Sequence, residues 1–226
     1  MHPLATPAAG SNTSVAGVLL SLGALLTMVC ILLEVRAGWA SLTGPMQRTD
    51  LEAATFLADN WERMRSIWTW SLVGNGILAV AALLLMQRST TVFTSLAWAV
   101  YFLGNLLLIL CFALSLGSYP PAFAVLAEQP YVFEVARGAP LVLFELGALF
   151  GFSVFPLYFG QALREHGMVS RGEAAFVLLL IVGTFATILL GYLSITVFAL
   201  SCFLVPFLLG LAYFRRGGAV TARSVL

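Results

Sequence analysis

The sequence contains no lysine, and it has only two histidines and three cysteines among 226 residues. Without lysine, a retinal-type Schiff base is impossible. Haem in a helical bundle is generally held by histidines on the spans, whereas His2 and His166 lie in the leader and in a short polar segment. A b-type cytochrome is therefore disfavoured. The cysteines form no CxxC pair, which excludes a disulfide framework and zinc spacing: Cys30, Cys111 and Cys202.

Charge is equally scarce. Charged residues make up 9% of the chain and hydrophobic residues 61%, with a mean hydropathy of +0.99. A soluble domain has about 25% charged residues, and a chain this apolar needs lipid to solvate part of its surface. The sequence therefore predicts an integral membrane protein whose first partner is the lipid bilayer. A net charge of +1 leaves no basic footprint for nucleic acid.

Familiar catalytic patterns are missing. The sequence has no HExxH, GxSxG or Walker motif. It also has no acidic pair within an apolar run and no arginine-rich voltage-sensor repeat. We therefore predict no catalytic residue, no metal site and no cofactor, and a membrane enzyme is disfavoured.

Long apolar runs define the fold class. A helix of about 20 apolar residues crosses a hydrocarbon core of about 30 Å. The sequence predicts one all-α domain over residues 1–226, a bundle of six transmembrane helices. The last two runs adjoin each other, so a five-helix alternative stays open. The predicted spans are residues 14–33, 67–86, 92–116, 140–163, 174–194 and 195–214.

The first span is expected to be retained, because its leader has no Lys or Arg and its run is too long for a signal peptide. Six spans place both termini on one side of a cell membrane. Arginines on that side lie in short loops and the tail, where the positive-inside rule applies best. We expect both termini to be cytoplasmic and call the opposite side the outer side.

An amphipathic outer helix is predicted between spans one and two. Thr49 or Asp50 can cap its N-terminus. Apolar residues then recur at spacings of three and four, which makes one face: Ala54, Leu57, Trp61, Met64 and Trp68. Trp61, Met64 and Trp68 could dock a partner, or they could anchor the helix at the membrane interface.

A second outer segment separates spans three and four. Pro120, Pro121 and Pro130 argue against one long helix there. The fourth span is accordingly expected to begin at Pro140. On that placement Glu145 lies about 7–8 Å inside the span.

Four polar residues are candidates for a pocket in the outer half of the bundle. An ionisable residue in a span is a functional-site hypothesis by default, and Glu145 is that residue here. Asn75 and Asn105 lie about 12 and 17 Å deep by helix rise. Tyr101 precedes Asn105 by four residues and shares its helix face. Three alternatives stay open for this set: structural hydrogen bonding between helices, a ligand pocket, and proton or ion coupling.

Small residues predict helix packing in two spans. Gly147 and Gly151 form a GxxxG pair in the fourth span, and Gly183 and Gly191 flank Thr187 at the same spacing in the fifth. Pro156 and Pro206 are expected to kink their helices. These residues are expected to serve packing rather than mechanism.

The layout resembles a group of bacterial six-helix integral membrane proteins known only as a domain of unknown function. The resemblance rests on the leading "VAGVLLSLGALL" span and on longer segments after spans one and three. It also rests on "LGALFGFSVFPLYFGQAL", which precedes a short polar loop and two close spans. It implies the same six-helix fold and no activity.

Three functional hypotheses follow. The first is a small non-enzymatic multi-pass protein that binds a lipid-like or small apolar ligand, or that acts as a subunit or modulator of a membrane complex. The second is a proton-coupled transporter that uses Glu145. The third is the disfavoured membrane enzyme. A membrane protein partner or a homo-oligomer fits the first hypothesis.

Overall fold

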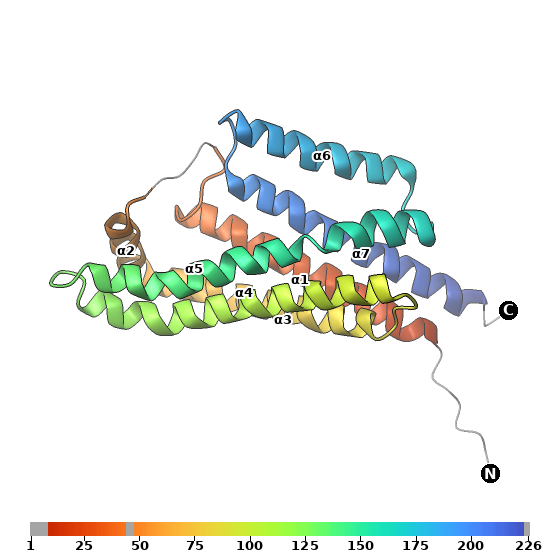
Figure 1. Ribbon diagram of the computed structural model, residues 1–226, viewed down its shortest axis with the longest axis horizontal. Coiled ribbons are helices and arrows are strands. Elements are labelled where there is room, and N and C mark those ends of the chain that lie inside the picture. Colours follow the sequence, from red (N-terminus) through yellow and green to blue (C-terminus); the bar gives the residue numbers. More distant parts are fainter. Residues whose placement is uncertain (1–8, 44–47, 224–226) are drawn as a thin grey trace, which may run out of the picture.

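The computed structural model describes residues 9–43 and 48–223, and this part of the chain is helical (Figure 1). Six of its helices are long and apolar enough to cross a membrane. The chain is therefore a multi-pass all-α bundle, as predicted. The elements in order are α1 (Ala9–Ala37), α2 (Asp50–Asp59), α3 (Trp61–Met86), α4 (Val92–Ala124), α5 (Tyr131–Gly151), the π-helix η1 (Pro156–Glu165), α6 (Arg171–Leu189) and α7 (Ile195–Arg223).

The two ends of the bundle differ. The first turns of α1 and the last turns of α7 lie at one end, which we call proximal, and α2 lies at the other, distal end (Figure 1).

In a bilayer the backbone must satisfy its own hydrogen bonds, and these long apolar runs do so as helices. α4 has 33 residues and is about 50 Å long. It therefore extends beyond a hydrocarbon core of about 30 Å.

Paired glycines let three helix pairs approach closely. Gly17 of α1 faces Gly210 of α7, and Gly23 of α1 faces Gly74 of α3. A Cβ on Gly104 of α4 would lie 3.0 Å from the carbonyl oxygen of Gly147 on α5. Close backbone approach of this kind is the usual basis of helix association in membranes.

Of the four glycines predicted to serve helix packing, Gly147 is the one whose own Cβ position would meet a neighbouring helix, whereas the Gly151 backbone nitrogen lies near Gly104. A Cβ on Gly151 or Gly183 would meet nothing within 4 Å. Gly191 has a φ of +79° and lies in the turn between α6 and α7. That left-handed conformation suits glycine because it has no Cβ, so Gly191 serves the turn and not helix packing.

Prolines interrupt the helices less than the sequence suggests. α4 continues through Pro120 and Pro121, and α5 begins at Tyr131 rather than at Pro140. Packing compensates for the lost hydrogen bonds, because Tyr119 and Phe133 are buried against each other with ring centroids 5.1 Å apart. The segment is nevertheless not one long helix, as expected, because α4 ends at Ala124 and α5 begins at Tyr131. The expected start of the fourth span at Pro140 is wrong.

Pro156 does mark a break. α5 ends at Gly151, and the chain turns before η1 begins at Pro156. The buried Tyr213 of α7 holds η1 through a hydroxyl that donates to the Gln161 Oε1, 2.7 Å away. The fourth predicted span is thus an α-helix followed by a separate π-helical segment, and such segments are frequent at functional sites.

The predicted outer helix is present but shorter than expected. α2 ends at Asp59, and Trp61 starts α3. Met64 and Trp68 therefore lie on α3, where both are buried in a distal cluster of apolar side chains from α1 to α5. Trp61 packs edge-on against Trp68 with ring centroids 6.1 Å apart. Met64 and Trp68 are buried and the half-buried Trp61 packs against their cluster, so the three side chains do not form a free docking face.

The N-terminus of α2 has a capping box. The Thr49 hydroxyl accepts from the Glu52 backbone N–H, and the Thr49 backbone N–H donates to the Glu52 carboxylate at 2.8 Å. These bonds from Thr49 lower the pKa of the exposed Glu52 carboxyl below its usual value. At pH values above its unfolded pKa of about 4.3, the ionised Glu52 carboxylate therefore stabilises α2. That stabilisation is lost as the pH falls through the lowered pKa.

Replacing Thr49 with alanine is expected to weaken α2 by about 1 kcal/mol, because one backbone donor loses its cap. Hydrogen exchange of the α2 amides, measured by mass spectrometry, should be faster in Thr49→Ala than in the unchanged chain. Thr55→Ala is the matched control, since the Thr55 hydroxyl donates only to the Leu51 carbonyl within the helix. Equal exchange in all three proteins would contradict the role of the capping box.

Candidate functional site

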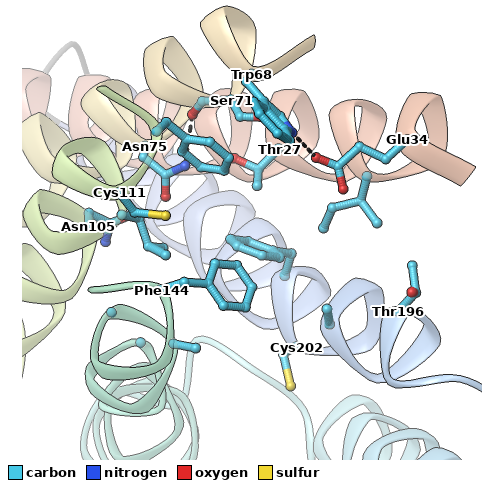
Figure 2. A pocket seen from close by; sticks show the side chains of 18 of the residues that line it. Thr27, Glu34, Trp68, Ser71, Asn75, Asn105, Cys111, Phe144, Thr196 and Cys202 are labelled. Atoms are coloured by element: carbon cyan, nitrogen blue, oxygen red, sulfur yellow. Dashed lines mark hydrogen bonds between the residues drawn. The ribbon is translucent and has the colours of Figure 1, made fainter. Parts of the chain in front are cut away.

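A cavity of about 550 Å³ lies between α5 and α7 (Figure 2). Its walls come from α1, α3, α4, α5 and α7, and the segment after α1 contributes Trp39 and Ala40. Its volume falls within the range of about 300–1,000 Å³ typical of ligand pockets. Most of its lining is apolar, and each of the five helices also contributes at least one polar side chain, including Arg137 of α5 and Thr196 of α7.

The cavity exists because α5 and α7 pack on different partners. α5 packs on α4 and α7 packs on α1, and within the described residues no backbone contact joins α5 to α7. Cavity-lining side chains of α5 remain exposed, including Leu141 at 43% and Phe144 at 49%. Phe152 and Phe198 meet across the gap, with ring centroids 6.1 Å apart. Within a membrane, the gap between α5 and α7 would face lipid.

Two asparagines supply the deepest polar groups. The Asn75 Nδ2 donates to the Ser71 carbonyl at 2.7 Å, and the Asn105 Nδ2 donates to the Tyr101 carbonyl at the same distance. Each amide nitrogen is therefore used on its own helix, because a carbonyl can only accept. The Asn75 Oδ1 is buried and has no hydrogen-bond partner. Figure 2 shows this oxygen on the side of α3 that faces Cys111.

Glu34 lies at the distal end of the cavity (Figure 2). The Trp68 Nε1 donates to its Oε1 at 2.9 Å. Glu34 forms no ion pair with any residue that the structure describes. A carboxylate has about four acceptor positions, so most of the capacity of this one is not used by the Trp68 bond.

Sequence reasoning missed Glu34 because it ended the first span at Leu33, one residue before the carboxylate. The structure continues α1 to Ala37. One signal was present in the sequence. Thr27, Ile31 and Glu34 recur at spacings of four and three, which places them on one helix face, and all three line the cavity.

The predicted pocket residues are only partly brought together. Asn75, Asn105 and Tyr101 line the cavity, and each is at most 3% exposed. Glu145 does not join them. Its side chain is exposed on α5, next to Phe144, which does line the cavity. The difference arises because α5 turns the helix face that includes Arg137, Phe144 and Ala148 towards the cavity.

An ion pair joins α5 to α2 near the distal end of the cavity. The Arg137 Nη1 lies 2.5 Å from the Asp50 Oδ1, which ties α5 to the start of α2. The Arg48 guanidinium stacks 4.2 Å from the Phe56 ring centroid and donates to the Gly38 carbonyl. The Arg48 contacts link the start of α2 to the residue that follows α1.

The chemical groups of the cavity are few. In the described part of the chain, no group of three or more His, Cys, Asp or Glu side chains could hold a metal ion. Cys111 and Cys202 line the cavity as free thiols. The site combines a large apolar surface with a few polar side chains, which is the usual composition of a small-molecule site.

Comparison with known proteins finds no relative: no family model, curated protein or solved structure matches the chain. The resemblance to the bacterial six-helix family therefore stays a prediction.

Proposed function

We propose that this protein is a small non-enzymatic membrane protein that binds a lipid-like molecule in the cavity between α5 and α7. The observation that supports the proposal most directly is the cavity itself, about 550 Å³ in volume and lined mainly by apolar side chains. Its location between two helices without backbone contact gives a membrane-dissolved molecule a route from the bilayer.

The buried polar groups favour ligand binding over purely structural hydrogen bonding. Structural bonding between helices would pair the asparagines with neighbouring helices. Instead, the Asn75 and Asn105 amides donate to their own helices. The Asn75 Oδ1 has lost its contact with water and has gained no protein partner in exchange, which costs about 1–3 kcal/mol. A ligand that donates a hydrogen bond would offset this cost.

Proton coupling through Glu145 gains no support from the cavity, because Glu145 does not line it. A role as a subunit of a complex would need a docking surface other than Trp61, Met64 and Trp68, since Met64 and Trp68 are buried. Ligand binding is therefore the function that the geometry supports best.

Photo-crosslinking tests the proposal. The full chain, in its own membranes, is exposed to a long-chain alcohol that carries a diazirine, and the labelled peptides are identified by mass spectrometry. We expect labelling to concentrate on the faces of α5 and α7 around Phe144 and Cys202, and unlabelled alcohol should reduce it. Leu179 of α6 is the internal control, because it is 72% exposed and does not line the cavity.

Equal labelling of α5, α6 and α7, with no effect of unlabelled alcohol, would contradict the proposal. That result would mean that the probe samples the whole lipid-facing surface and that the cavity retains nothing.

A further inference from the structure

Several hydrogen-bond donor groups around the cavity each make a bond within the protein. This matters because an apolar cavity selects its ligand through a few polar groups. Arg137 is paired with Asp50, the Trp68 Nε1 donates to Glu34, and the Ser115 hydroxyl donates to the Cys111 carbonyl at 2.9 Å. The amides of Asn75 and Asn105 donate to their own helices. Each of these side chains is thereby oriented towards a protein partner, although an amide retains a second N–H.

Two acceptors at the cavity have unused hydrogen-bonding capacity. Glu34 accepts one hydrogen bond and has no ion pair among the described residues, and the Asn75 Oδ1 accepts none. Asn75 is 1% exposed, so its free oxygen is a built-in part of the wall rather than a surface group. A charged carboxylate beside an apolar cavity is costly unless a positive group or hydrogen-bond donors accompany it.

Two further aromatic rings pack against Trp68, the hydrogen-bond partner of the same carboxylate. The Trp68 ring lies 6.1 Å from the Trp39 ring and 5.8 Å from the Tyr119 ring, both measured between centroids. All three side chains line the cavity together with Glu34. Aromatic faces attract cations at distances up to about 6 Å. A carboxylate with aromatic neighbours is suited to an ammonium group.

The position of Glu34 along α1 suits a contact with the polar head group of a bound amphiphile. Glu34 follows Ser14, the first residue of the α1 span, by 20 residues. This places it about 30 Å along the helix, near the distal surface of a hydrocarbon core of about 30 Å. Asn75 follows Trp68 by seven residues, so it lies about 10 Å deeper along α3. An amphiphile would thus place its head at Glu34 and its chain along α5 and α7.

We infer that the cavity selects a single-chain amphiphile with a primary amine head, which Glu34 binds as an ammonium group. This inference rests on the proposed function, because it identifies the ligand class of the same cavity. The Asn75 Oδ1 is then available to a second donor, such as a hydroxyl group, about 10 Å further along the ligand. A fatty acid is disfavoured, since its carboxylate would meet the carboxylate of Glu34.

The test is a competition between three probes of equal chain length. The full chain is placed in phosphatidylcholine nanodiscs and labelled with the diazirine alcohol. Dodecylamine, dodecanol and dodecanoic acid are then titrated as competitors. Labelling of α5 and α7 is divided by labelling of the lipid-facing Leu179 region of α6, which corrects for partition into the bilayer. We expect dodecylamine to displace the cavity label at a concentration at least tenfold lower than either competitor.

Two matched variants assign the preference to one residue. Glu34→Gln should remove the advantage of dodecylamine while the label is retained. Glu145→Gln should keep that advantage, because Glu145 is exposed on α5 and does not line the cavity. An advantage of the amine that survives in Glu34→Gln would overturn the inference. So would equal displacement by the three competitors in the unchanged chain, a result that needs no variant to fold.

The two proposals fail in different ways. Cavity labelling that all three competitors displace equally would leave lipid binding in place and overturn only the amine preference. Absence of any preferential label on α5 and α7 would overturn both.

Discussion

Gly17→Val is expected to lower the free energy of unfolding by about 3 kcal/mol, near the upper end of the usual cost of overpacking. A Cβ at Gly17 would lie 2.6 Å from the Gly210 carbonyl oxygen and 2.8 Å from the Phe214 backbone nitrogen. Both are backbone atoms of α7, so no side-chain rotation can relieve the clash. The two helices must separate, which disrupts the pair that supports one wall of the cavity.

The measurement is reversible unfolding in detergent, followed by tryptophan fluorescence. Gly183→Val on α6 is the matched control, because a Cβ there would meet nothing within 4 Å. The two substitutions have the same effect on intrinsic helix propensity. If they prove equally stable, the close approach of α1 and α7 does not hold the bundle together.

Ala199→Trp is expected to reduce labelling of the cavity by the diazirine alcohol at least tenfold. Ala199 lies on α7, lines the cavity and is half-buried. An indole at this position would project into the space that the ligand chain needs. Because the gap between α5 and α7 is bordered by exposed side chains, the substitution should fill the cavity without displacing a packed helix.

Ala186→Trp is its matched control, since Ala186 is exposed on α6 and does not line the cavity. Labelling in this variant should equal that of the unchanged chain. Full labelling in Ala199→Trp would show that the probe binds elsewhere, whereas loss in both variants would indicate a general effect of a bulky aromatic group.

The number and order of the helices could be predicted because each span is a long apolar run. The convergence of Asn75, Asn105 and Tyr101 on one cavity could also be anticipated, since helix order and helix rise place them at similar depths. The extension of α1 to Glu34 was missed because a hydropathy boundary was treated as a helix boundary. Helices do not stop where the hydrocarbon core stops.

The remaining features depend on contacts between distant segments. The helical path through Pro120 and Pro121 is supported by buried side chains such as Tyr119 and Phe133. The face of α5 that borders the cavity follows from the fit of Gly147 against Gly104 of α4. The separation of α5 from α7 is a property of the whole bundle, and no local pattern in the sequence encodes it.

The pairing of α1 with α7 also has a consequence for biosynthesis. The Ser21 hydroxyl donates to the Phe207 carbonyl at 3.0 Å, which links residues 186 positions apart. Chains are made from the N-terminus, so α1 leaves the ribosome long before its partner exists. Ala16, Gly17 and Leu20 are fully buried or nearly so in the finished bundle. Until the last helix has been synthesised, that face of the first helix has only lipid or the insertion machinery to cover it.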